Sequence, residues 1–175
     1  MILTTERLIL RPPDLADAPA IQRLAGAREV ALNTLMIPHP YPDGAAEAWI
    51  NKQRTEDEIN FVITLRESGE LAGAMGLLVS REHARAEIGY WIGVPYWNRG
   101  YATEAGRAVV RFAFEELGLN RVDAEVFSRN PASSRVLQKL GMRHEGTHRA
   151  HIVKWGQSID VESYAVLRAE WNSSL

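Results

Sequence analysis

Alternation of apolar and polar residues predicts seven strands along this chain of 175 residues. A strand with one buried face repeats with a period of two, and Gly, Pro, Asn and Ser mark the turns between such runs. The pair Ser68-Gly69 therefore predicts a hairpin turn between the second and third strands. The predicted strands cover residues 3–12, 59–66, 71–80, 86–93, 121–127, 142–155 and 159–167.

Apolar residues at helical spacing, together with capping residues, predict four helices that begin near residues 17, 43, 101 and 130. Asp17 and Asn130 are the expected N-caps of the first and fourth helices, and Gly26 and Gly141 are expected to end them. Helices interleaved with these strands predict an α/β (α+β) fold, in which long helices flank a mixed, largely antiparallel sheet.

Composition narrows the functional classes. The chain is 46% hydrophobic, and its length suits one domain over residues 1–175. Because it has 20 basic and 22 acidic residues and no long run of one sign, we do not expect nucleic acid as its primary ligand. The absence of cysteine excludes disulfides, thiolate zinc sites and a cysteine nucleophile. No apolar stretch is long enough to span a membrane, so we expect a cytoplasmic protein.

The segment "NRGYAT", residues 98–103, carries the clearest chemical signal. A helix N-terminus has unpaired backbone N–H groups and a partial positive charge, so it attracts phosphate when side chains leave room. Gly100 and Ala102 leave that room, Arg99 adds positive charge and Thr103 adds a hydroxyl. A plain strand-to-helix turn is the alternative reading. The segment is neither a Walker A loop nor a GxGxxG fingerprint.

Several segments together resemble one family. "EIGYWIGVPYWNRGYATEA", "NPASSRVLQKLGMRHEG" and "TTERLILRP" are similar to the GNAT N-acetyltransferase superfamily, and to its RimJ/RimL-like branch, which acetylates ribosomal proteins. The resemblance extends from residue 3 to Trp171. It implies a GNAT fold with about seven strands and about four helices. The fourth and fifth strands, 86–93 and 121–127, would start paired and then splay apart.

The resemblance implies acetyl-CoA as co-substrate, with its pantetheine arm between the splayed strands and its pyrophosphate on the loop before the third helix. Asn130 could contact the arm, cap its own helix, or do both. The sequence departs from the wider family at Trp97, where Gln or Arg is frequent, and from the branch at Asn98. The implied cofactor-binding residues are Trp91, Ile92, Asn98, Arg99, Gly100, Tyr101, Ala102, Thr103, Asn130 and Ser133.

Acetyl transfer from a thioester needs a neutral amine, a polarised carbonyl and a proton for the leaving thiolate. By resemblance Ser133 would supply that proton. Other relatives use a tyrosine as the general acid, and Leu137 stands at the matching position here. Glu125 and Glu87 are rival candidates for the base, and each could instead be a solvated or structural carboxylate. We expect direct transfer in a ternary complex to a primary amine, with a protein N-terminal α-amine favoured.

Other acceptors and other functions remain open at this point. A small amine or an antibiotic could be the acceptor, or the chain could be a non-catalytic acyl-CoA-binding module. We expect no metal site, because His148 and His151 are three apart in a predicted strand and would face opposite sides. With His144 they would border the acceptor site, which Trp49 and Trp155 could wall. Relatives are frequently dimers, so a homodimer is a further expectation.

Overall fold

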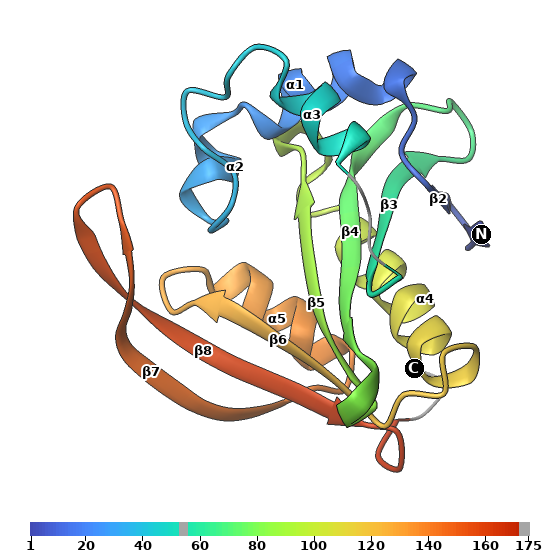
Figure 1. Cartoon of the computed structure of the whole chain (residues 1–175), viewed down its shortest axis with the longest axis vertical. Helices are drawn as coiled ribbons and strands as arrows, with labels where there is room; N and C mark the ends of the chain where they lie inside the picture. The colour runs from blue at the N-terminus through green and yellow to red at the C-terminus, as the bar shows by residue number, and fades with distance from the viewer. Residues whose placement is uncertain (53–55, 172–175) are drawn as a thin grey trace.

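A computed structural model describes residues 1–52 and 56–171 and contains one eight-stranded sheet (Figure 1). The strands lie in the order β1-β2-β3-β4-β5-β6-β8-β7, and all neighbours are antiparallel except β5 and β6. Their bounds are β1 Leu3–Thr4, β2 Leu8–Arg11, β3 Glu58–Leu65, β4 Leu71–Ser80, β5 Arg85–Ile92, β6 Arg121–Phe127, β7 Arg143–Lys154 and β8 Gln157–Leu167.

The eighth strand arises because the predicted first strand is two strands. Thr5 makes a tight turn in which its N–H donates to Leu8 O at 3.0 Å and its hydroxyl oxygen accepts from Leu8 N–H at 3.0 Å. The chain therefore folds back on itself, and Leu3 pairs with Leu10. The reversal coincides with a run of four polar residues, residues 4–7, which interrupts the alternation between Leu3 and Leu8 and which the prediction of one strand did not take into account.

Five α-helices are present among the described residues, one more than predicted. The additional helix, α2, follows Ala27, which makes no side-chain capping bond, so the sequence carried no start signal there. Asp17 occupies the predicted N-cap position of α1, but its side chain makes no capping bond there: it binds Arg11, and Asp14 caps the preceding 3-10 turn. The helices are α1 Ala18–Ala25, α2 Arg28–Leu32, α3 Ala45–Asn51, α4 Tyr101–Glu115 and α5 Pro131–Lys139, with 3-10 turns at Leu15–Asp17, Arg81–His83 and Val94–Tyr96.

Helices cover both faces of the sheet. On one face α1 and α3 pack over Val62 and Leu71, and on the other α4 packs over Ile88 through residues such as Val109, with α5 beside it. Each of these buried side chains stabilises the fold by about 1.5–3 kcal/mol. The two helical layers leave one stretch of the sheet open, and it lies between β5 and β6.

Strands β5 and β6 pair only at their beginnings. Their parallel register joins residues 85–87 to residues 121–123 and then stops, although both strands continue. Figure 1 shows the two strands side by side at the bottom and diverging upward. We call the open stretch between residues 88–92 of β5 and 124–127 of β6 the gap. The splayed pair predicted from the family resemblance is thus confirmed.

Strands β7 and β8 form a long hairpin beyond β6, closed by a turn at Trp155-Gly156 with φ of +51° and +76°. Its register shifts between His148 and Ile152, where Ala150 has a φ of +51° and donates its N–H to Asp160 Oδ1 at 2.7 Å. This bulge bends the strand and re-aims the side chains on either side of it. No helix within residues 1–52 and 56–171 combines the length and the apolar character that crossing a membrane requires.

Candidate functional site

The gap exposes one backbone donor of β5 at its end. Gly93 donates its N–H to Ala72 O of β4 at 2.8 Å, so by alternation the Ile92 N–H points the other way, into the gap. Trp91 differs from the expectation, because its carbonyl faces β4. A Cβ built on Gly73 would lie 2.3 Å from that oxygen, which explains the glycine. Of the two predicted backbone partners, Ile92 is therefore the one with a free donor in the gap.

The loop after β5 turns through two left-handed residues before α4 begins. Asn98 has a φ of +60° and Gly100, the N-cap of α4, has a φ of +80°. Such pairs of turns aim successive N–H groups to one side and form a concave anion site. The first intrahelical bond runs from Glu104 N–H to Gly100 O at 3.0 Å, so the N–H groups of residues 101–103 precede it and point outward. The loop therefore presents three N–H groups at the start of α4, and its binding of phosphate stays a prediction.

Arg7 braces this loop from the turn between β1 and β2. Its guanidinium donates to Glu104 Oε2 at 2.7 Å and to Arg99 O at 3.0 Å, and it lies 4.9 Å from the Tyr101 ring centroid. Sequence reasoning did not single out Arg7, because more than 90 residues separate it from the loop. The pairing matters, since Glu104 puts a negative charge in the first turn of α4 and Arg7 compensates it.

The Glu104 carboxylate is held in its ionised form. Burial raises the pKa of this carboxyl, but hydrogen bonds from the Thr5 hydroxyl and from the N–H and guanidinium of Arg7 outweigh burial and lower it. Trp97 fixes the other end of the loop by donating its indole N–H to Ile92 O at 2.7 Å. Trp97 departs from the wider family pattern, and its indole anchors the loop to the end of β5.

Ser133 lies across the gap from β5, in the first turn of α5. Its N–H donates to Asn130 Oδ1 at 3.2 Å, so the predicted N-cap is confirmed. Its hydroxyl oxygen lies 2.6 Å from the hydroxyl oxygen of Tyr90 on β5. Burial raises the pKa of Tyr90 to about 12, although the hydrogen bond with Ser133 acts in the opposite sense. The sequence analysis had not identified Tyr90, which reads there as one more apolar strand residue.

The two candidate bases lie on the other side of the sheet. Residues 87 and 90 are three apart on one strand, so Glu87 faces away from Tyr90. Desolvation raises the pKa of Glu87, and so do the carboxylates of Glu125 and Asp123, while Arg85 opposes them. Glu125 stands exposed on β6, close enough to act on Glu87 by its charge. Two carboxylates on the two splayed strands therefore face one region.

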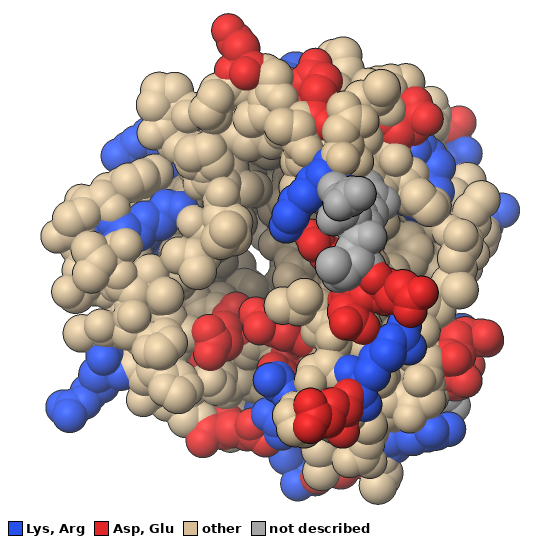
Figure 2. Space-filling model, viewed as in Figure 1, with Lys and Arg blue, Asp and Glu red and all other residues tan. Residues whose placement is uncertain are grey.

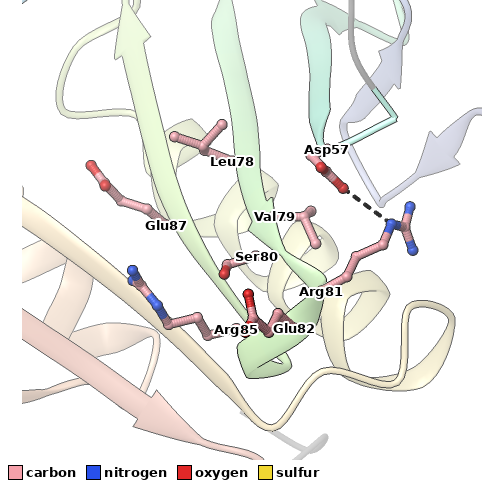
Figure 3. Close-up of a pocket in the computed structure, with 8 residues that line it drawn as sticks. All are labelled: Asp57, Leu78, Val79, Ser80, Arg81, Glu82, Arg85 and Glu87. Carbon is pink, nitrogen blue, oxygen red and sulfur yellow. Dashed lines mark hydrogen bonds and ion pairs between the residues drawn. The ribbon is translucent and has the colours of Figure 1, made fainter.

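Two hollows flank that region. One, of about 410 Å³, lies at the β4–β5 hairpin end and includes Glu87, which extends from β5 on the same side as Arg85 (Figure 3). The second, of about 250 Å³, lies over β6, β8 and β7 and includes Glu125. Figure 2 shows an opening at the centre of this face, with acidic side chains gathered along its lower edge. The second hollow is lined by Arg121, Asp123, Ala124, Glu125, Glu145, Gly146, Thr147, His148, Ser163 and Tyr164.

The histidines of β7 lie differently from the expectation. His148 and His151 were predicted to face opposite sides, but their rings are 5.0 Å apart, because the bulge at Ala150 shifts the alternation by one residue. His148 borders the second hollow, with Nε2 3.0 Å from Ser163 Oγ. His144 is paired with Glu162 at 2.6 Å. In the part of the chain that the structure describes, no group of three or more His, Cys, Asp or Glu side chains could hold a metal ion.

Two basic side chains join the segments that flank the opening. Lys154, buried at the end of β7, donates to the carbonyls of Thr34, Leu35 and Ile37, and Arg129 donates to Leu32 O at 2.6 Å. Burial lowers the pKa of Lys154, and the charge of Arg129 lowers it further. The loop after α2 is thereby fastened to the β7–β8 hairpin, and the opening is closed on that side.

The predicted aromatic walls lie apart from each other. Trp155 stands 46% exposed at the tip of the β7–β8 hairpin, with its ring 6.3 Å from that of His39. Trp49 packs beside the core formed by α1 and α3. Only Trp155 therefore lies on the segment that closes the opening.

Comparison with known proteins identifies the family. Residues 7–143 match the family described as "Acetyltransferase (GNAT) domain". The chain is 33% identical over 173 residues to p20 of Bacillus licheniformis, named an uncharacterized N-acetyltransferase, and 97% of each chain is covered. The crystal structure of a GNAT-family acetyltransferase from Bacillus anthracis matches with a TM-score of 0.88 at 28% identity, over 97% of this chain and 100% of that one.

One further relative and one structural neighbour have names that specify an acceptor. YdaF of Bacillus subtilis, provisionally named a ribosomal N-acetyltransferase, is 36% identical over 104 residues, which cover 59% of this chain and 57% of YdaF. A spermidine N-acetyltransferase from Vibrio cholerae, in complex with CoA and spermine, shares the fold with a TM-score of 0.84 at 22% identity, over 95% and 98% of the two chains. From the match over residues 7–143 and the identity to p20 along nearly its whole length, the chain belongs to the GNAT acetyltransferases and is an N-acetyltransferase.

Proposed function

We propose that this protein is one catalytic domain that moves an acetyl group from acetyl-CoA directly to a primary amine in a ternary complex. The observation that carries the proposal is the left-handed loop at Asn98 and Gly100, which leads into α4 beside the open edge of β5. A phosphate seat and an unpaired strand edge, side by side, suit a ligand with a pyrophosphate at one end and an amide-bearing arm at the other.

The residues present fit acetyl-CoA. The N–H groups from Asn98 to Thr103 would hold the pyrophosphate, with Arg99 supplying positive charge and Arg7 offsetting the charge of Glu104. The Ile92 N–H would bond the pantetheine arm or the acetyl oxygen. Asn130 already accepts from Ser133 N–H through Oδ1, and its amide NH₂ stays available for the arm. When bound, acetyl-CoA supplies an activated acetyl thioester, so no enzyme nucleophile is required.

We assign the proton transfers to residues on opposite faces of the gap. Glu87 is the proposed base for the acceptor ammonium. Its raised pKa makes this carboxylate a stronger base than an ordinary glutamate. Glu125 is the rival base. Ser133, on the α5 side, gives its hydroxyl proton to the leaving thiolate. A base on one face and an acid on the other suit an amine that approaches opposite the leaving sulfur.

The acceptor is the finer part of the proposal. We favour a protein N-terminal α-amine and a place in the RimJ/RimL-like branch, supported by the similarity to YdaF and by the motifs at residues 87–105 and 130–146. A small polycationic amine is the second candidate. The carboxylates of Glu87 and Glu125 favour it, since they would attract a second positive charge on the acceptor.

Release of CoA thiol from acetyl-CoA tests the proposal. The assay uses N-terminal peptides, polyamines and aminoglycosides as acceptors, beside calorimetric titration of CoA. We expect CoA binding and turnover with one acceptor class, which names the substrate. CoA binding without turnover on any acceptor would favour a non-catalytic acyl-CoA-binding module, and absence of CoA binding would refute the site.

We also propose a cytoplasmic location and a homodimer. The sequence has no cysteine, which suits a reducing compartment. Light scattering on the eluted protein would separate a dimer from a monomer of 19.6 kDa.

A further inference from the structure

The hydroxyl groups of Tyr90 and Ser133 form a direct link across the gap. Their oxygens lie 2.6 Å apart, although the residues are 43 positions apart in sequence. Tyr90 comes from the unpaired stretch of β5, after the last residue in register with β6, and Ser133 comes from α5, which packs on β6. The bond therefore joins the two diverging arms of the sheet at the place where the leaving sulfur would lie.

Tyr90 is the better donor of the two. A phenol is far more acidic than an aliphatic hydroxyl, so it gives the stronger hydrogen bond when the two compete to donate. Burial raises the pKa of Tyr90 to about 12, so the phenol keeps its proton at any physiological pH. Ser133 Oγ then accepts from Tyr90, and its own proton is free to point elsewhere. Asn130 meanwhile fixes the Ser133 backbone through the N–H.

We propose that Tyr90 is a positioning residue that directs the Ser133 hydroxyl proton at the leaving sulfur and offsets the charge that develops on Ser133 Oγ during the transfer. This inference rests on the proposed function, in which Ser133 is the acid. As the C–S bond breaks, its electron pair goes to sulfur and the Ser133 proton follows. As that proton leaves, the Tyr90 proton moves along the 2.6 Å hydrogen bond to Ser133 Oγ, and solvent water returns a proton to the Tyr90 phenolate. The acceptor ammonium loses one proton to Glu87, its nitrogen then forms the C–N bond, and it loses a second proton to solvent as the amide forms. One of these two protons replaces, through solvent, the proton given to sulfur, and the other is released, so protons balance.

A double-mutant cycle tests the inference. Ser133→Ala should lower kcat about 100-fold, the lower end of what a positioned acid contributes. Tyr90→Phe keeps the buried ring and removes only the hydroxyl, and should lower kcat about tenfold, as expected for one hydrogen bond to a charged atom. Neither change should alter the Kd for CoA. In the Ser133→Ala background Tyr90→Phe should cost less than twofold, because the partner is absent.

The matched control is Ser134→Ala, the next residue of α5, which should leave kcat unchanged. Equal losses from Tyr90→Phe in both backgrounds would overturn the positioning role and leave the proposed function standing. Unchanged kcat in Tyr90→Phe would also overturn the positioning role and leave the proposed function standing. Unchanged kcat in Ser133→Ala would refute the acid itself, and both proposals would fall at that step. Thermal unfolding of each variant separates these outcomes from a loss of folded protein.

Discussion

Arg7 Nε donates to Glu104 Oε2 at 2.7 Å, which ties the N-terminal turn to the first turn of α4. The same guanidinium holds the Arg99 carbonyl, so one side chain fixes both sides of the Gly100 turn. Without Arg7, the Glu104 charge would face any phosphate seated on the helix N-terminus. The pair therefore controls both the shape and the charge of the proposed pyrophosphate site.

Arg7→Met should weaken CoA binding. We expect Kd to rise about tenfold, since an uncompensated carboxylate would lie beside the phosphate seat, and a pair of this kind contributes about 1–2 kcal/mol. Calorimetry measures the change. The double variant Arg7→Met with Glu104→Gln should recover part of the affinity, because it removes the uncompensated charge. Equal affinity of Arg7→Met and the unchanged protein would show that the brace does not matter to the ligand.

Gly100→Glu should abolish CoA binding, because a carboxylate would enter the phosphate seat. The backbone at this position also disfavours any side chain, since its φ is +80°. Gly69→Glu is the matched control: its φ is +75°, it lies in the β3–β4 hairpin turn, and a Cβ there meets nothing within 4 Å. Both variants should lose similar thermal stability, and only Gly100→Glu should lose affinity. Similar CoA affinities in the two variants would refute the assigned seat.

Glu87→Gln should lower kcat/KM about 100-fold if Glu87 is the base. In the unchanged enzyme kcat/KM should fall as the pH falls through the raised pKa of Glu87, which lies above 4.5. Glu125→Gln should shift this limb to lower pH, because the Glu125 charge raises the pKa of Glu87. Loss of turnover in Glu125→Gln, with Glu87→Gln near normal, would reverse the assignment of the base.

The same pKa shift predicts the effect of Glu87→Gln on stability. A raised folded-state pKa means that the folded chain binds the proton more tightly than the unfolded chain does. The contribution of Glu87 to the free energy of unfolding is then fully present below pH 4.5 and is lost as the pH rises through the pKa of the folded state. Glu87→Gln should therefore unfold no more easily than the unchanged protein at pH 7. Urea unfolding at pH 4 and pH 7 measures the difference, and a clear loss at pH 7 would contradict it.

Lys154→Met should loosen the segment after α2. The carbonyls of Thr34, Leu35 and Ile37 lose their shared donor, so hydrogen exchange of the backbone amides in residues 33–37 should become faster. Lys139→Met, at the exposed end of α5, is the control and should leave this segment unchanged. Hydrogen exchange followed by mass spectrometry measures both variants. Equal protection of residues 33–37 in the two variants would show that Lys154 does not fasten the segment.

Local signals in the sequence determined much of the fold. Periodicity located most of the sheet, and Asn130 with Pro131 located the start of α5, because caps and alternation act between residues a few positions apart. The left-handed turn at Gly100 was also readable, since glycine is the residue that adopts it without strain. These features need no knowledge of what packs against them.

Tertiary structure alone decided the contacts between distant segments. Arg7 meets Glu104, and Tyr90 meets Ser133, only because the sheet brings β2 and β5 against α4 and α5. The bulge at Ala150, which turned His148 and His151 to one side, depends on Asp160 across the hairpin. Sequence patterns report which face a residue occupies, whereas hydrogen bonds between side chains depend on distances that the packed layers set.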